Sequence, residues 1–286
     1  MTRRHYLLLA AGIAFVLAGT VAGAGLGPPR TLPAQWSFGR GPTVVLVHGL
    51  GSGTAHWLPV ARRLAARHRV ALVELPGHGL APMPRPLTLD RAAAALDRAL
   101  EQIGGEPVVL VGHSLGGLVA ARAALARPQR VAGLVLVEAA LSPQFSAAEA
   151  AALRRALDAD PAGALRAAWV SFGRDSAQGE RLWAETSRHD PRMLRAWIEV
   201  ALREDLSEAA AGLRMPVLAA VSARTWPRGE AWGPTARALG LTNVATLTVE
   251  RFDDCGHFVM LDRPDALADR IAAFVRAVRG EPVAHR

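Results

Sequence analysis

The sequence predicts an α/β protein with a doubly wound, mostly parallel sheet and an inserted helical cap, and three observations support this. Between residues 35 and 252, short β-branched runs alternate with Ala-, Leu- and Arg-rich stretches of helical period, as expected of crossovers onto a parallel sheet. Residues 142–212 interrupt this alternation without a convincing strand. The chain has 286 residues, 51% of them hydrophobic, which is enough for one core and a small cap.

The expected strands are continuous apolar runs, because helices would cover both faces of the sheet. In chain order they are Thr43–Val47, Val70–Glu74, Val108–Val111, Leu134–Val137, Val217–Val221 and Ala245–Val249. Helices of the core are expected near Ala55–Ala66, Asp90–Ile103, Leu115–Ala126 and Pro264–Val278. The core domain would therefore comprise residues 25–141 and 213–286, on either side of the cap.

The cap, residues 142–212, contains start signals for three helices. Ser146-Ala-Ala-Glu149 is a capping box, Pro161 opens a second helix, and Asp190-Pro191 opens a third. Four aromatic residues are concentrated here, and they either pack the cap against the core or line an apolar substrate pocket: Trp169, Phe172, Trp183 and Trp197.

The first 24 residues have the parts of an export signal peptide. Arg3-Arg4-His5 precede an almost unbroken apolar run from Tyr6 to Val21, and Ala22-Gly23-Ala24 supplies the small residues of a cleavage site. The paired arginines also resemble the twin-arginine pattern of export in the folded state. The alternative is an uncleaved membrane anchor, since the segment from Tyr6 to Leu26 is just long enough to cross a bilayer, which takes about 20 residues. We expect an exported protein, periplasmic or extracellular.

The charge and cysteine content argue against several other classes. Basic residues outnumber acidic ones by 33 to 25, for a formal net charge of +8, and every Lys or Arg position is Arg. These arginines are interleaved with Asp and Glu on expected helix surfaces instead of forming a clustered stripe, so we expect no nucleic-acid partner. The single cysteine, Cys255, excludes an internal disulfide, and we interpret it as a buried packing residue.

Gly112-His113-Ser114-Leu115-Gly116 is a G-x-S-x-G motif directly after an apolar strand and directly before a helical pattern. The glycines allow a sharp turn from strand to helix without a Cβ clash, so the Ser114 hydroxyl projects from the turn. The N-terminus of the following helix favours negative charge that develops beside it. Strand before and helix after make the motif strong evidence for a reactive serine.

Three further turns follow expected strands: His48-Gly49-Leu50-Gly51 after the first, Leu75-Pro76-Gly77-His78-Gly79 after the second, and Asp254-Cys255-Gly256-His257 after the last. With these motifs, the sequence from Gly41 to Val278 resembles the α/β-hydrolase superfamily, in particular its esterase-like serine hydrolases with a helical cap.

This resemblance implies a set of catalytic roles. Ser114 would be the nucleophile and His257 its general base. The backbone N–H groups of Leu50 and Leu115 would form the oxyanion hole. We interpret the other histidines of the turns, His48, His78 and His113, as turn or hydrogen-bonding residues.

The carboxylate that should orient the base is missing from its usual place. Members of the superfamily usually carry an Asp shortly after the penultimate strand, but residues 217–226 contain no carboxylate. Glu138 fits best, because it ends the strand after the nucleophile, from which some members supply the acid. Glu230 is the alternative, and Asp253 and Asp254 lie close to the base in sequence. A purely structural Glu138, or no acid at all, also stays open.

The sequence predicts no cofactor and no metal site, since no H-E-x-x-H pattern or close carboxylate cluster accompanies the histidines. The candidate lining of the substrate pocket is aromatic: Trp57, Phe145, Trp169 and Phe258.

We expect a secreted serine hydrolase that cleaves apolar carboxylic esters, or less favourably amides or carbon–carbon bonds next to a carbonyl, through an acyl-enzyme on Ser114. A serine at this position disfavours haloalkane and epoxide hydrolysis, for which related proteins use an aspartate. The alternative, suggested by the missing acid, is a non-catalytic ligand-binding or signalling protein on the same fold.

Overall fold

A computed structural model describes residues 34–281 of the chain. Residues 1–24, for which the sequence predicts an export signal or an anchor, lie outside the described residues, so that assignment stays a prediction. Within residues 34–281, no helix is both long enough and apolar enough to cross a bilayer.

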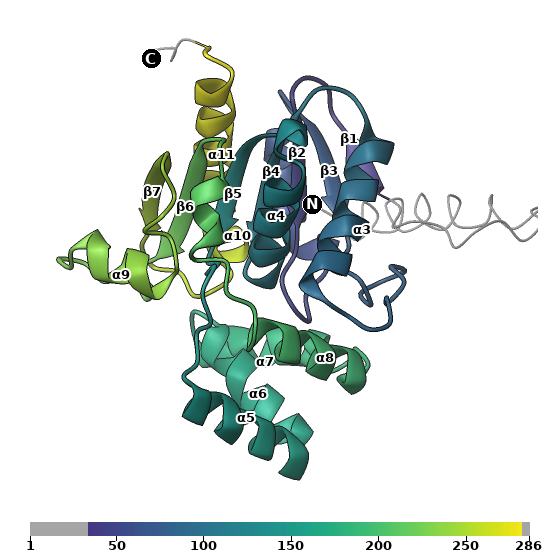
Figure 1. Ribbon diagram of the computed structural model, residues 1–286, viewed down its shortest axis with the longest axis vertical. Coiled ribbons are helices and arrows are strands. Elements are labelled where there is room, and N and C mark those ends of the chain that lie inside the picture. The colour runs from purple at the N-terminus through teal and green to yellow at the C-terminus, as the bar shows by residue number, and fades with distance from the viewer. Residues whose placement is uncertain (1–33, 282–286) are drawn as a thin grey trace, which may run out of the picture. The chain divides into compact units, whose positions relative to one another are not determined.

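The strands of this region form one sheet in the spatial order β1-β3-β2-β4-β5-β6-β7 (Figure 1). All neighbours from β3 to β7 run parallel, whereas β1, at the edge, is antiparallel to β3. The predicted doubly wound, mostly parallel sheet is therefore confirmed. The strands are β1 (Ala34–Phe38), β2 (Thr43–Val47), β3 (Arg69–Val73), β4 (Val108–His113), β5 (Val131–Val137), β6 (Val217–Ser222) and β7 (Leu247–Phe252).

The differences from the sequence prediction have simple causes. β1 is missing from the predicted strands because Ala34–Phe38 contains no β-branched residue. This segment is extended because it pairs with β3. β7 begins and ends later than predicted because it contains Glu250 and Arg251. An apolar run therefore marks only the first part of this edge strand.

Helices cover both faces of the sheet (Figure 1). On one face α3 (Leu89–Ile103) packs against α4 (Leu115–Ala126), and on the other α2 (Leu58–Leu64) packs against α11 (Pro264–Val278). The helix predicted at Ala55–Ala66 is shorter, because a 3₁₀ turn precedes α2. The remaining short elements are η1 (Thr54–Trp57), η2 (Pro128–Arg130), η3 (Ala209–Gly212), α9 (Trp232–Ala238) and α10 (Val259–Asp262).

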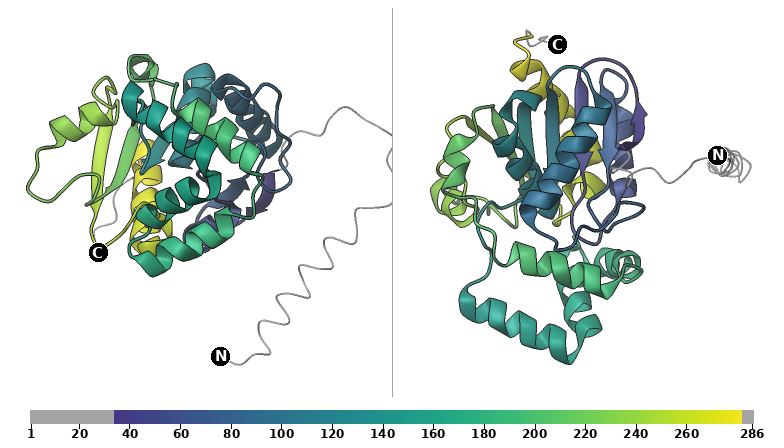
Figure 2. Two further views of the ribbon diagram at one scale, coloured as in Figure 1. Left: turned by 90° about the horizontal axis from the view of Figure 1, so that it is seen from below. Right: turned by 45° about the vertical axis from the view of Figure 1, so that its right-hand side comes forward.

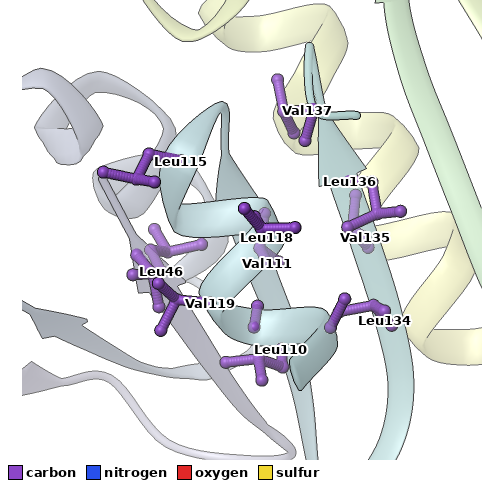
Figure 3. Close-up of a cluster of buried hydrophobic side chains, with 14 of the residues drawn as sticks. Leu46, Leu110, Val111, Leu115, Leu118, Val119, Leu134, Val135, Leu136 and Val137 are labelled. Atoms are coloured by element: carbon purple, nitrogen blue, oxygen red, sulfur yellow. The ribbon is translucent and has the colours of Figure 1, made fainter. Parts of the chain in front are cut away.

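The core places α4 against the middle of the sheet (Figure 3). Leu115, Leu118 and Val119 of α4 lie beside buried side chains of β2, β4 and β5. Burying a Leu or Val side chain stabilises a fold by about 1.5–3 kcal/mol, so this packing fixes the helix firmly. The start of α4, and with it Ser114, is therefore held in one position at the end of β4.

Four inserted helices lie between β5 and β6 in the chain and beyond the carboxyl ends of the strands (Figures 1 and 2). The predicted capping box is present, with Ser146 accepting from the Glu149 N–H and Glu149 accepting from the Ser146 N–H. The sequence analysis missed one helix, α7, although Asp175 caps its start. The helices are α5 (Ala147–Ala159), α6 (Pro161–Phe172), α7 (Ser176–Thr186) and α8 (Pro191–Ala201).

The inserted helices are hydrogen-bonded to loops that follow the strands. Trp197, which is fully buried, therefore serves the packing role that the sequence left open for it. The bonds run from Trp197 Nε1 to Pro76 O (2.9 Å), from Thr186 Oγ1 to Gly51 O (2.8 Å) and from His257 N to Phe172 O (2.9 Å).

Candidate active site

Ser114 lies at the sharp turn between β4 and α4. Its φ of 51° is in the left-handed region, which is unusual for a residue with a side chain, and its N–H donates to Val137 O at 2.9 Å. A Cβ atom on Gly112 would lie 2.4 Å from Gly116 O, and one on Gly116 would lie 2.3 Å from His48 O. Only glycines therefore permit this turn, as the motif predicts.

His257 follows β7 and is held from two sides. Its N–H is bonded to Phe172 O, and the Nε2–H of His113 donates to His257 O at 2.9 Å. Burial and the neighbouring His257 lower the pKa of His113 well below its usual value, so His113 is neutral and suited to this bond. The ring of Phe172 lies 4.8 Å from the His257 ring, between centroids.

Glu138, immediately after β5, brings a carboxylate to the imidazole. Its Oε2 lies 3.3 Å from His257 Nδ1. The carboxylate is itself fixed, because Oε1 accepts from Ser222 N at 2.5 Å and Oε2 accepts from Thr225 Oγ1 at 2.9 Å. Its side chain is 4% exposed, and its φ of 48° is again left-handed. The candidate acid and the candidate base are therefore in contact.

The other candidate acids are directed elsewhere. Glu230 is exposed, does not line the cavity described below, and accepts through its backbone oxygen from Trp226 Nε1. Asp253 forms an ion pair with Arg228 at 2.8 Å. Asp254 does not line the cavity either. Glu138 alone among these candidates lies against His257 in the described structure.

Ser114, His257 and Glu138 line one cavity of about 410 Å³. No hydrogen bond joins Ser114 to His257 within residues 34–281. Such bonds are often long in enzymes without substrate and shorten when substrate binds. A hydroxyl, an imidazole and a carboxylate therefore line one cavity, and the imidazole and the carboxylate are in contact.

The two residues expected to supply the oxyanion hole, Leu50 and Leu115, both line the same cavity. Leu115 is the first residue of α4, so its N–H has no acceptor within the helix. Leu50 also lines the cavity. Neither N–H donates to another group of the described chain. Both N–H groups are therefore without an acceptor in the described chain, and their role as oxyanion-hole donors stays a prediction.

Most of the cavity lining is apolar and comes from the core and from α5, α6 and α8. Phe145, Trp169 and Phe258 line it, as the sequence predicts. The prediction for Trp57 is wrong: this side chain is fully buried in the hydrophobic core and does not reach the cavity. It ends the short turn η1, whose other buried residues also face inward.

Histidines below the site hold the loop that carries Leu50. Gly51 N donates to His78 Nε2 at 3.0 Å, and His48 lies fully buried beside Glu74, with Nε2 2.8 Å from Oε2. Burial raises the pKa of Glu74, but the neighbouring His48 and the hydrogen bonds from the Thr54 N–H and hydroxyl outweigh it and lower the pKa to about 2. These histidines make the hydrogen bonds expected of turn residues.

Cys255 behaves as a packing residue. It is buried, and its thiol donates to Phe252 O at 3.2 Å. Burial, helped by the nearby Glu138 carboxylate, raises the pKa of this thiol to about 12. Among the described residues, no group of three or more His, Cys, Asp or Glu side chains could hold a metal ion.

The sequence analysis missed the residues that support the acid. Ser222 ends β6 and Thr225 follows it, 84 and 87 positions after Glu138, and no local pattern connects them to it. Phe172, which lines the cavity and contacts the His257 ring, was noted only as one of several cap aromatics.

Residues 44–270 match the model of the alpha/beta hydrolase family. A pimeloyl-[acyl-carrier protein] methyl ester esterase from Aromatoleum aromaticum is 33% identical over 261 residues, covering 82% of this chain and 98% of that protein. The polyketide synthase ThaQ of Burkholderia thailandensis is 31% identical over 83% of this chain, which spans only 12% of that protein's length. A hydrolase structure from Oleispira antarctica superposes with a TM-score of 0.73 at 16% identity, covering 84% of this chain and 93% of the other, and so supports the fold.

Proposed function

The chain belongs to the alpha/beta hydrolase family and is an esterase-like hydrolase, and we propose that it cleaves apolar carboxylic esters through an acyl-enzyme on Ser114. The observation that carries this proposal is the 3.3 Å contact between Glu138 and His257 at the wall of the cavity that Ser114 also lines. A carboxylate that holds the imidazole in one tautomer completes the serine hydrolase arrangement. The non-catalytic alternative was suggested by the missing acid, and the contact between Glu138 and His257 supports catalysis over it.

The first half of the reaction forms the acyl-enzyme. His257 takes the proton of the Ser114 hydroxyl while the oxygen attacks the ester carbonyl, and Glu138 stabilises the resulting imidazolium. The tetrahedral oxyanion accepts hydrogen bonds from the N–H groups of Leu50 and Leu115, each worth roughly 2.7–4 kcal/mol in comparable enzymes. The intermediate then expels the alcohol, which takes the proton from His257.

The second half uses water. His257 removes a proton from a water molecule, whose oxygen attacks the acyl carbonyl on Ser114. The second oxyanion is held by the same two N–H groups. When it collapses, Ser114 regains its proton from His257 and the carboxylic acid leaves. The balance is one ester and one water consumed, and one acid and one alcohol produced.

The substrate class follows from the cavity lining and the relatives. The side chains around the cavity are mostly apolar and aromatic, which suits an apolar acyl or alkyl chain. The pimeloyl-[acyl-carrier protein] methyl ester esterase relative supports ester hydrolysis over amide or carbon–carbon cleavage. We also propose that the inserted helices α5–α8 act as the cap that closes the cavity from solvent.

A fluorophosphonate probe tests the proposed nucleophile. We expect stoichiometric labelling of the unaltered protein and none of Ser114→Ala, because only an activated serine reacts with such a probe. Ser171→Ala, which removes an exposed hydroxyl on α6 outside the cavity, is the matched control and should label fully. Absence of labelling in well-folded protein would contradict the acyl-enzyme and favour the ligand-binding alternative.

We further propose that the protein is exported, on the strength of the N-terminal pattern. Mass spectrometry of the protein purified from its own host's cell envelope or medium should find Gly25 as the first residue. An intact N-terminus in the membrane fraction would instead indicate the anchor. Replacing Arg3 and Arg4 together by Lys should block export if the twin-arginine route is used.

A further inference from the structure

The cavity has two polar parts in an otherwise apolar wall. The first contains the proposed catalytic groups with His113 and Thr225 beside them. The second consists of Ser142, Gln144 and Glu204, and the catalytic mechanism does not use it. Apolar side chains of α5, α6 and α8 complete the wall. A substrate in the cavity would therefore meet a second polar region besides the reacting one.

This second region is formed by the two connections between the core and the inserted helices. Ser142 and Gln144 precede α5, and Glu204 follows α8. The two connections are joined by a backbone hydrogen bond from Leu206 N to Leu141 O at 2.6 Å. The backbone that carries Glu204 is therefore close to the contact that joins the two connections.

The Glu204 carboxylate has no partner within residues 34–281, neither a hydrogen bond nor an ion pair. Its neighbours in sequence do have partners: Glu199 pairs with Arg154 at 3.0 Å, and Asp205 accepts from Ser207 N at 2.9 Å. Glu204 is partly buried, so a charge there loses some of its hydration without compensation. A cationic ligand group would supply what is missing.

Neighbouring groups of the wall do not neutralise this carboxylate. The amide of Gln144 donates to the backbone oxygens of Ser142 and Ala238, and the Ser142 hydroxyl also donates to Ala238 O. In the described part of the chain no arginine lines the cavity, although the sequence has an excess of them. Within the described lining, Glu204 is therefore the only charged side chain of this second polar region.

We propose that Glu204 is a specificity-determining residue that selects esters whose apolar chain carries a positively charged amine. The chain would occupy the apolar wall, and the ammonium would bind the Glu204 carboxylate. An ester of the same length that ends in a carboxylate would be disfavoured by like-charge repulsion. This inference rests on the proposed ester hydrolysis and adds the substrate class to it.

The test compares p-nitrophenyl esters of equal chain length that end in ammonium, methyl or carboxylate, in a series of lengths. In the unaltered protein we expect kcat/KM to be highest for one of the ammonium esters and lowest for the carboxylate esters. Glu204→Gln keeps the shape and removes the charge, so the ratio of ammonium to methyl ester should fall by about tenfold or more, the usual effect of losing a hydrogen bond to a charged group.

Glu208→Gln is the matched control. It makes the same change of charge four residues later, at an exposed side chain that does not line the cavity. Both ester ratios should stay as in the unaltered protein. An ammonium-to-methyl ratio that Glu204→Gln changes by less than about twofold would overturn the proposal, since a hydrogen bond to a charged group normally changes such a ratio by about tenfold or more.

Ionic strength gives a second measurement that needs no variant. The formal net charge of the chain is +8, so its overall field repels a cation and salt would raise the rate of the ammonium ester. If the ammonium binds Glu204, salt acts in the opposite direction. Added salt screens the local attraction, so the ratio of kcat/KM for the ammonium ester to that for the methyl ester should fall. A ratio that rises or stays constant with salt would overturn the proposal.

Ser114→Ala distinguishes failure of the proposed ester hydrolysis from failure of the proposed role of Glu204. If hydrolysis of the methyl-terminated ester survives this substitution, the proposed function fails. If that hydrolysis depends on Ser114 but the ester ratio ignores Glu204→Gln, only the assignment of Glu204 fails.

Discussion

Replacing Glu138 by Gln tests the acid that the sequence left least certain. The Glu138 side chain is 4% exposed and that of His257 is 20% exposed, so the pair lies between protein interior and solvent. At the 3.3 Å between Oε2 and Nδ1, and with an effective dielectric constant of about 20, a carboxylate attracts an imidazolium by about 5 kcal/mol. Losing that attraction in the transition state corresponds to a decrease of roughly 10³- to 10⁴-fold in kcat.

The structure also explains why the Glu138→Gln variant should fold. The glutamine side chain is nearly isosteric with glutamate, and its oxygen can still accept the hydrogen bond from Ser222 N. The amide NH₂ would then face His257 Nδ1 and favour the wrong tautomer of the ring.

The assay is steady-state hydrolysis of a p-nitrophenyl ester, with thermal unfolding of each variant as a check on folding. Glu230→Gln is the matched control, because this exposed residue does not line the cavity, and its kcat should change by less than about twofold. Equal and mild effects of the two substitutions would refute the reasoning. The same conclusion would follow if Glu138→Gln lowered kcat by less than about tenfold.

Three further predictions concern stability and reactivity. Gly112→Ala should lower the melting temperature by about 5 °C or more, because the new Cβ would lie 2.4 Å from the backbone oxygen of Gly116 and such overpacking costs about 1–3 kcal/mol. Gly233→Ala is the control. Only the tip of an arginine side chain lies within 4 Å of its Cβ, so the melting temperature should stay nearly unchanged. Burial lowers the pKa values of His78 and His113 well below 6.5. Below about pH 6.5 the unfolded chain therefore binds more protons than the folded chain, and the melting temperature should fall as the pH is lowered from about 7 to about 5. A melting temperature that stays constant or rises over this range would contradict the prediction. Cys255, with its pKa raised to about 12, should react with a thiol reagent at about pH 8 only after unfolding, and rapid labelling of the native protein would show that the thiol is accessible.

Much of the fold was predictable because its signals are local. The strands from Thr43–Val47 to Val217–Ser222 are apolar runs, since both of their faces are covered, and such runs are visible in any short window of sequence. The capping box at Ser146 is equally local. The edge strand Ala34–Phe38 was not predictable, because its order comes from pairing with β3 and not from its own composition.

The candidate site also has features with local sequence signals and features that depend on distant contacts. The sequence by itself determined the turn around Ser114. The turn depends on backbone sterics within five residues, and the glycines at fixed offsets from the serine are visible in the sequence. It also indicated His257, by a turn after the last strand.

Only the tertiary structure showed that Glu138, and not Glu230, lies against His257, that Trp57 belongs to the core, and that Glu204 lines the cavity without a partner in the described chain. These properties depend on which segments meet across the ends of parallel strands and across the insertion. Contacts between residues 80 or more positions apart, such as Ser222 with Glu138, leave no periodic or local pattern, so they become visible only when the chain is folded.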